Sequence, residues 1–360
     1  MKTENIPADI KSKSLKETRD EIDTILSKLE NQETNLDESI DDYQRLILLN
    51  KHVDQLFKKR FKEIAKKKMI IKKKLLKNAK KVDKFLINYL KKQKNSLLIK
   101  PMKYGVISGG KKIRSTIIFD IGKMFNLREK KLINICAAVE CIHSYSLIHD
   151  DLPCMDNDKI RRGKPSTHIK FGEASAVLAG SSLLTLAFEI IANKKYLLNS
   201  KMKNEIITSL ANCSGHTGIA GGQELDLKFE NKAKKINQII DMQKKKTGKL
   251  FNFCLYAVGV VANKTKKEKK LLSNLGEEIG LLFQLADDFL DKKGSENLLG
   301  KPVKKDNKKG KTTLLNLMGE KKAYLYANNL KKNILRKLKK HGKKAKEITR
   351  TIDFILERKF

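Results

Sequence analysis

The chain has 360 residues, 40% of them hydrophobic, which is enough to bury the core of one large domain and a small one. No apolar stretch follows the start, "MKTENIPADIKSK", so no secretory signal is predicted, and the longest uncharged apolar run, residues 174–188, is shorter than the ~18–20 residues of a membrane span. Five cysteines without paired spacing argue against a zinc site or a disulfide framework and predict a cytoplasmic location.

The formal net charge of +37 lies almost entirely in the second part of the chain. Residues 1–57 hold 8 Lys+Arg and 13 Asp+Glu, a net charge of −5, whereas residues 69–360 hold 63 and 27. Only 10 of the 78 basic residues are arginine, as AT-rich codon usage would produce. A basic field also attracts small polyanions, so both explanations of the charge stay open.

Two amphipathic helices are predicted first. Residues 14–30 place Leu15, Ile22, Ile25, Leu26 and Leu29 on one stripe, and a helix after residue 35 carries Leu36, Ile40, Tyr43, Leu46, Ile47 and Val53. Because such small helices cannot bury their stripes alone, residues 1–57 predict a helical hairpin that docks on a partner. The run 58–68, "KKRFKEIAKKK", predicts a solvated basic linker, and Met69 opens a fresh helix and the large domain, 69–360.

The large domain is predicted to be all-α. Apolar residues recur at three- and four-residue spacing, and no proline lies between Pro165 and Pro302.

Four aspartates, Asp150, Asp151, Asp156 and Asp158, crowd into "HDDLPCMDNDKIRRGKPSTH". Pro153 must kink or end the preceding helix, which lets Asp150 and Asp156 converge although an unbroken helix would hold them ~240° apart. Clustered carboxylates repel unless a cation lies among them, and hard oxygen ligands without His or Cys favour Mg²⁺. The adjacent pair Arg161 and Arg162 suits phosphate or carboxylate.

A second acidic group lies in the apolar segment "FQLADDFLD", which contains Asp287, Asp288 and Asp291. Asp287 and Asp291 share a helix face with Gln284, one turn earlier. Two acidic boxes on apolar helices predict a metal-binding pair rather than two solvated surfaces.

Other residues fit a diphosphate site: Lys111 and Arg114 in "GGKKIR", Lys246, Thr247 and Lys249 in "KKKTGKL", and Lys301 and Lys311 in a glycine-bounded loop. His143 lies two helical turns before Asp150 and so faces the same side. A plain surface role for each lysine and a core role for His143 remain alternatives.

These motifs, together with "GGQELDL" and "GKTTLLNLMG", resemble in order and spacing the trans-isoprenyl diphosphate synthases, and among them the bacterial enzymes that make farnesyl diphosphate. The resemblance covers about residues 69–360. It implies the isoprenoid-synthase helical bundle, usually a homodimer, with the two acidic boxes facing each other across a cavity.

The resemblance also implies roles for individual residues. Asp150, Asp151, Asp156 and Asp287 bind the Mg²⁺ ions that hold the allylic diphosphate, with Arg161 helping. Lys111, Arg114, His143 and Arg162 form the isopentenyl diphosphate site, and Lys246, Thr247, Gln284 and Lys301 line the allylic pocket.

The implied activity joins isopentenyl diphosphate to dimethylallyl or geranyl diphosphate, giving (2E,6E)-farnesyl diphosphate. Geranyl and geranylgeranyl products are alternatives. In this family a bulky residue at the position of Tyr145 limits product length. Ser115 and Ser181 depart from the family pattern, which has proline and aspartate there.

Residues 13–65 resemble an unrelated family, the small subunit of exodeoxyribonuclease VII, which binds its large subunit through helices. The chain thus resembles two neighbouring proteins fused in one frame, and the nuclease large subunit is an implied partner. A nucleic-acid-binding scaffold and a terpene cyclase are the competing functions; carboxylates in a cavity repel nucleic acid, and a cyclase needs no second diphosphate site.

Overall fold

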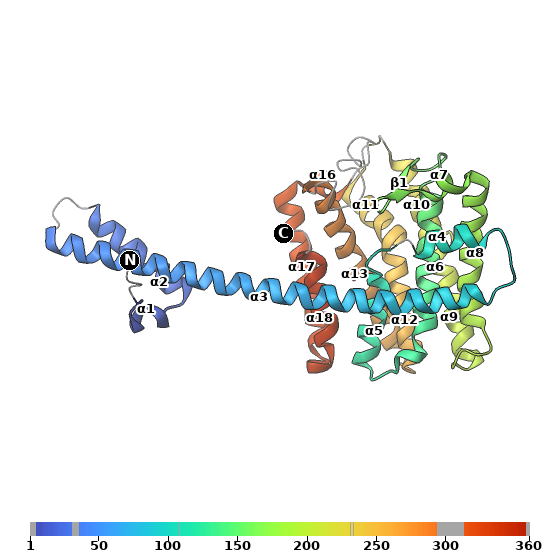
Figure 1. Ribbon diagram of the computed structural model, residues 1–360, viewed down its shortest axis with the longest axis horizontal. Helices are drawn as coiled ribbons and strands as arrows, with labels where there is room; N and C mark the ends of the chain where they lie inside the picture. The colour runs from blue at the N-terminus through green and yellow to red at the C-terminus, as the bar shows by residue number, and fades with distance from the viewer. Residues whose placement is uncertain are drawn as a thin grey trace. The chain divides into compact units, whose positions relative to one another are not determined.

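The computed structural model describes residues 5–30, 36–107, 109–230, 232, 234–293 and 313–357. The chain divides into two compact units, Met1–Lys72 and Lys73–Phe360. Each unit is described separately below (Figure 1).

The first unit is a small helical hairpin formed by α1 (Ala8–Ser12), α2 (Leu15–Leu29) and the first part of α3 (Leu36–Lys91). Ser14 and Glu17 cap α2 reciprocally, because the Ser14 hydroxyl accepts from the Glu17 N–H and the Glu17 carboxylate accepts from the Ser14 N–H. Its core consists of Ile6, Ile10, Ile25 and Leu49.

The predicted hairpin is confirmed in outline, but its stripes are only partly buried. Ile22, Ile25, Leu29 and Leu46 pack at the core, whereas Leu15, Leu26, Ile40, Tyr43 and Ile47 are exposed. The likeness to a nuclease subunit and the domain assignment 1–57, 58–68 and 69–360 stay predictions.

The expectation that Met69 opens a fresh helix is wrong. Helix α3 runs without a break from Leu36 to Lys91, through the whole basic run. Residues 36–91 contain neither proline nor glycine, and Lys, Arg, Glu and Ala are all good helix formers. The run is solvated as predicted, because residues 58–67 are exposed, but it is helical.

The second unit is an all-α bundle, as predicted (Figure 1). After the end of α3, its elements are α4 (Ile99–Ile107), α5 (Ile113–Met124), η1 (Glu129–Lys131), α6 (Ile133–Asp150), β1 (Ile160–Arg161), β2 (Lys164–Pro165), α7 (Thr167–Phe171), α8 (Glu173–Ala192), α9 (Ser200–Ser214), α10 (Ile219–Phe229), α11 (Ile236–Gln243), η2 (Lys244–Gly248), α12 (Lys249–Val261), α13 (Lys266–Lys293), α16 (Leu314–Met318), α17 (Glu320–Lys339), η3 (Gly342–Ala345) and α18 (Lys346–Glu357).

The core of the bundle is built on two extensive helix pairs, α6 with α8 and α12 with α13. Helix α12 is buried on nearly all sides, and its Phe251 and Phe253 are among the largest fully buried side chains. Helix α6 ends at Asp150, and the last two turns of α13 carry Asp287, Asp288 and Asp291, so these packed helices hold the two acidic segments near their C-terminal ends.

Among the described residues, α8 alone is long and apolar enough to cross a membrane. It packs along α6 in the bundle, and core helices of folded domains commonly have this composition.

Candidate active site

The first acidic segment turns back on itself after α6. Helix α6 ends at Asp150, three residues before Pro153, as the proline predicted. The Asp156 N–H then donates to the Asp150 carbonyl at 2.8 Å, and the Asp158 N–H donates to the Asp151 carbonyl at 3.0 Å. The predicted convergence of Asp150 and Asp156 is therefore present in the backbone.

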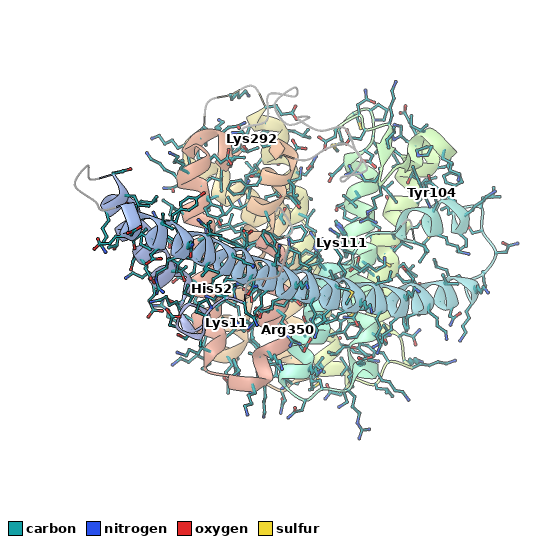
Figure 2. All side chains as sticks on the ribbon, turned by 60° about the vertical axis from the view of Figure 1, so that its left-hand side comes forward. Lys11, His52, Tyr104, Lys111, Lys292 and Arg350 are labelled. Atoms are coloured by element: carbon teal, nitrogen blue, oxygen red, sulfur yellow. The ribbon has the colours of Figure 1, made fainter. Side chains whose placement is uncertain are left out.

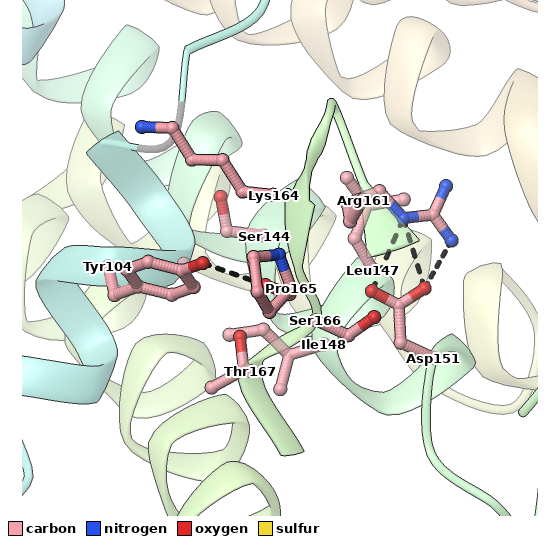
Figure 3. Close-up of a pocket in the computed structure, with 11 residues that line it drawn as sticks. Tyr104, Ser144, Leu147, Ile148, Asp151, Arg161, Lys164, Pro165, Ser166 and Thr167 are labelled. Carbon is pink, nitrogen blue, oxygen red and sulfur yellow. Dashed lines mark hydrogen bonds and ion pairs between the residues drawn. The ribbon is translucent and has the colours of Figure 1, made fainter. Parts of the chain in front are cut away.

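Arg161 holds this loop through Asp151. The Arg161 Nε donates to both carboxylate oxygens of Asp151, at 3.0 and 3.2 Å, and its Nη2 also pairs with Asp151 (Figure 3). The same Nη2 donates to Asp158 at 3.4 Å. Asp151 is only 2% exposed, and its burial raises the pKa of the carboxyl, which Arg161 opposes. Asp151 and Arg161 thus neutralise each other's charge in this structure. Direct contacts of Asp151 with metal and of Arg161 with diphosphate stay predictions.

The ionised form of Asp150 is destabilised by its surroundings. Burial raises the pKa of Asp150 to about 6, and the neighbouring Asp156 and Asp151 add to the rise, while Lys246 and Arg161 oppose it. A carboxylate in this setting is relieved by a nearby cation. Its donors, with Asp156, are hard oxygens, which fit Mg²⁺ completed by water and phosphate. The described residues contain no ready-made group of three His, Cys, Asp or Glu side chains around one point.

The second acidic box is held by a chain of amide and hydroxyl groups. The Thr247 hydroxyl donates to Gln284 Oε1 at 3.0 Å, and Gln284 Nε2 donates to Asp288 Oδ1 at 2.9 Å. Gln243 Nε2 donates to the other oxygen, Asp288 Oδ2, at 3.2 Å. The structure thus brings Thr247 and Gln284 together, as expected, and fixes Asp288 beside Asp287.

Lys246 and Thr247 lie on a π-helical turn, η2, inserted between α11 and α12. Such turns occur often at functional sites because the extra residue re-aims side chains. Two glycines let neighbouring helices approach the turn closely: a Cβ on Gly222 would lie 2.2 Å from the Lys246 nitrogen, and one on Gly280 would lie 2.6 Å from the Gly248 Cα. Lys246 Nζ pairs with Asp226 of α10 at 2.6 Å.

A separate group of cations gathers around His143. Burial and the charges of Arg114, Arg162 and Lys112 lower the pKa of His143 well below its usual value, so the imidazole is neutral at pH 7. The Arg114 guanidinium lies over the Phe251 ring at 4.7 Å, and burial also lowers the pKa of Arg114.

Arg162 joins this group through the glycines of "GGKKIR". It adopts a left-handed backbone conformation (φ 54°), and its Nη1 donates to the Gly109 carbonyl at 2.6 Å. A Cβ on Gly110 would lie 2.7 Å from the Arg162 Cζ, so the glycine makes room for the guanidinium. Three of the four residues expected at the isopentenyl diphosphate site are therefore neighbours.

The other predicted residues are placed as follows. Lys111 is exposed, with Nζ 5.9 Å from the centre of the Phe354 ring (Figure 2). Tyr145 packs edge-on against His149, with ring centres 5.1 Å apart, and burial and Asp150 raise its pKa. Lys301 and Lys311 lie outside the described residues.

Of the two residues that depart from the family pattern, the structure accounts for Ser115 and does not account for Ser181. Ser115 is buried, and its hydroxyl donates to Glu140 at 2.7 Å. Ser181 is exposed on α8, and nothing in the structure accounts for the residue there.

Sequence reasoning missed the π-helical turn, Asp226 and Gln243. Asp226 belongs to "GGQELDL", which stood out as a motif without any residue in it being assigned, and an acid in a glycine-rich apolar helix was the signal. Gln243 and the turn carried none, because one inserted residue barely alters an apolar pattern.

A small pocket lies behind Asp151 and Arg161, between α4, α6 and the β1–β2 turn (Figure 3). The Tyr104 hydroxyl donates to the Pro165 carbonyl at 2.7 Å beside it. Its volume of about 20 Å³ is room for about one water molecule. It cannot hold a prenyl diphosphate and is not the substrate site.

The fold and the site together define an all-α protein with two acidic boxes and a group of buried cations. The profile of the polyprenyl synthetase family matches residues 95–352. The chain belongs to the polyprenyl synthetase family.

Relatives with known names are similar over most of their length. The farnesyl diphosphate synthase of Escherichia coli (strain K12) is 37% identical over 269 residues, which is 73% of this chain and 90% of the relative. That of Bacillus subtilis (strain 168) is 40% identical over 228 residues, or 62% of this chain and 77% of the relative.

Solved structures of named synthases and transferases have a similar fold. An apo FPP/GFPP synthase from Zymomonas mobilis has a TM-score of 0.72 and 34% identity, covering 80% of this chain and 99% of its own. A geranyltransferase from Helicobacter pylori, solved with magnesium and isoprenyl diphosphate, has a TM-score of 0.68 and 31% identity, covering 80% and 97%.

Proposed function

We propose that the chain condenses isopentenyl diphosphate with dimethylallyl or geranyl diphosphate to give (2E,6E)-farnesyl diphosphate. The observation that carries the proposal is the presence in one bundle of two distinct groups: carboxylates at the end of α6 and on α13, and the arginines Arg114 and Arg162 around His143. Two such groups suit two diphosphate substrates, whereas a terpene cyclase binds one. The similarity to farnesyl diphosphate synthases supports the C15 product.

Asp150, Asp156 and Asp287 are the residues that we expect to hold Mg²⁺. Bound Mg²⁺ would supply positive charge to the departing diphosphate. The raised pKa of Asp150 supports this assignment, because a buried carboxylate among other carboxylates gains from a cation. Lys246, whose charge opposes that rise, would contact the same diphosphate.

Arg114 and Arg162 would bind the diphosphate of the second substrate. Their guanidinium groups can each form two parallel hydrogen bonds to phosphate oxygens. His143 is neutral, so it would contribute a hydrogen bond rather than a charge. The aromatic ring of Phe251 beneath Arg114 keeps water from one face of that guanidinium.

No protein nucleophile is required for this reaction. The allylic carbon–oxygen bond breaks, the isopentenyl double bond attacks the resulting cation, and the released diphosphate takes the proton. The protein orients the two substrates and excludes water that would quench the cation.

The decisive experiment incubates the full chain with dimethylallyl and isopentenyl diphosphates and Mg²⁺, then measures the chain length of the dephosphorylated products. A C15 alcohol supports the proposal, and C10 or C20 would replace the product. A hydrocarbon would indicate a cyclase, and no product would favour the nucleic-acid scaffold. Asp150→Asn should abolish turnover, whereas the exposed Asp23→Asn should not.

We further propose that the second unit forms a homodimer through α8. Val177 and Leu178 on this helix are 41% and 54% exposed, and two adjacent apolar side chains on the face of a core helix suit an interface. In a chain that begins at Met69, Leu178→Glu should lower the mass measured by sedimentation toward that of one chain.

A further inference from the structure

The first unit exposes a stripe of large apolar residues along α3. Its members and their exposed fractions are Ile40 (49%), Tyr43 (59%), Ile47 (46%), Phe57 (48%), Phe61 (69%) and Ile64 (37%). We call these six residues, with Asn50 and Asp54 between them, the α3 stripe. Six exposed large hydrophobic residues on one helix far exceed the scattered few of an ordinary surface.

The stripe faces away from the rest of the hairpin. On the other side of α3, Leu49 is buried in the hairpin core, Arg45 Nε donates to Glu21 of α2 at 2.6 Å, and His52 lies 3.0 Å from the Lys13 carbonyl (Figure 2). Positions 40, 43, 47, 50, 54, 57, 61 and 64 alternate steps of three and four residues, which is the a/d spacing of a coiled coil. The stripe is therefore suited to one further helix.

The order of residues in the stripe is symmetric about residue 52. Ile40 and Ile64 are equally far from it, as are Tyr43 and Phe61, and Ile47 and Phe57. The innermost pair is polar, Asn50 with Asp54. When two copies of this helix lie antiparallel about that centre, every apolar residue meets an apolar residue and the polar ones meet each other.

The charges beside the stripe are not symmetric: one end is acidic and the other end is basic. The beginning of α3 carries the exposed acids Asp37, Glu38 and Asp41, and residues 58–68 hold seven Lys+Arg and one Glu. Antiparallel pairing places the acidic beginning of α3 at the same level as the basic run 58–68 of the other copy. Parallel pairing would place the seven basic residues beside seven others, which is unfavourable.

The polar pair also sets the register. A shift by one heptad would bury the charged Asp54 against Tyr43 or Phe57, and a buried unpaired charge is costly. Single polar residues in coiled-coil cores are known to select register and orientation in this way.

We propose that the α3 stripe, residues 40–64, pairs antiparallel with the same residues of a second copy of this chain. The pairing is separate from the interface proposed on α8, and it does not depend on the catalytic activity.

The test is cross-linking between full-length chains that carry one added cysteine each. Ile40→Cys and Ile64→Cys chains with different tags are co-expressed and treated with a short bis-maleimide. A mixed 40/64 product is expected. Two chains that both carry Ile40→Cys, or that both carry Ile64→Cys, should not be joined, because 24 residues of helix separate those positions by about 36 Å.

The unaltered chain, with its exposed Cys154, gives the background for each combination. Products from 40/40 and 64/64 equal to that from 40/64 would overturn the antiparallel arrangement. Yields no higher than the background in all three would overturn pairing between copies and leave the stripe to a different protein.

A second measurement separates pairing from chance collision. Phe61→Glu in both chains should lower the 40/64 yield about tenfold or more, because it buries a charge in the contact. Leu15→Glu is the matched control: Leu15 is also an exposed apolar residue of the hairpin, 46% exposed, but lies on α2 outside the stripe, so its yield should not change. An unchanged yield for Phe61→Glu would contradict the proposal.

Discussion

Lys246 depends on Asp226 for its position. The 2.6 Å ion pair between them links α10 to the π-helical turn, and Asp226 is mostly buried, so few other groups can replace it. Asp226→Ala should therefore lower kcat about tenfold to hundredfold, since misplaced catalytic groups cost that much, while KM for isopentenyl diphosphate should change little.

Glu224→Ala is the matched control for Asp226. Glu224 lies two residues away on the same helix and also pairs with a lysine, Lys228, at 2.6 Å, but both side chains are about two thirds exposed. Steady-state kinetics of the two variants should differ clearly in kcat. Equal values would show that Asp226 has no special role.

Tyr145 is the residue that we expect to limit product length. It lies on α6 five residues before Asp150, partly buried, with its ring against His149. Tyr145→Ala removes this bulk below the reacting end of the substrate, so products longer than C15 should accumulate. Chromatography of dephosphorylated products measures this, with Tyr326→Ala on α17 as the control truncation. An unchanged product distribution would remove Tyr145 as the length determinant.

At the scale of elements, α3 shows how a lysine-rich run can mislead. Its charge predicted solvation, which is correct, but the expected helix break before Met69 is absent. Ala65→Pro tests the continuous helix, because proline inside a helix costs about 3 kcal/mol and exposes the backbone on either side. Trypsin should then cut within 58–68 faster than in the unaltered chain.

Ala65→Gln is the control for the proline variant, since glutamine is a good helix former. It should leave the rate of cleavage unchanged, and both variants should keep full prenyltransferase turnover. Rapid cleavage of the unaltered chain in this run would argue against the continuous helix.

The elements that sequence predicted well are those with strong local signals. Pro153 fixed the end of α6, and the apolar spacing fixed the helices that carry both acidic boxes. The π-helical turn at 244–248 could not be predicted, because its extra residue is accommodated by close packing against Gly222 and Gly280, which are distant in sequence. The same holds for the pairing of Asp151 with Arg161, which depends on the β1–β2 turn.

At the scale of the whole molecule, the boundary between the two units matters for stability. Lys74, just inside the second unit, donates to both oxygens of Asp120 at 3.0 and 2.9 Å and to the Thr351 hydroxyl at 2.9 Å. Asp120 is 3% exposed, and burial raises its pKa despite the lysine. A chain beginning at Met69 keeps this network, so its turnover should stay within about twofold of the full chain.

Replacing Lys74 in the chain that begins at Met69 should lower its free energy of unfolding. Lys74→Met leaves Asp120 buried without its cation, and breaking a buried pair in this way costs on the order of 3–5 kcal/mol of unfolding free energy. Lys81→Met is the control, since its partner Glu129 is 59% exposed and such surface pairs contribute only ~0–1 kcal/mol. Thermal unfolding should show a much larger loss for the first variant.

The pH dependence identifies the cause of that loss. In Lys74→Met the ionised form of Asp120 is the destabilising one, and its pKa is raised above the unfolded value, so the penalty is present at neutral pH and declines as pH falls and the carboxyl takes up a proton. The gap in melting temperature between Lys74→Met and the parent should therefore narrow in acid. A gap that stays constant with pH would assign the loss to packing of the Lys74 side chain rather than to the stranded charge of Asp120.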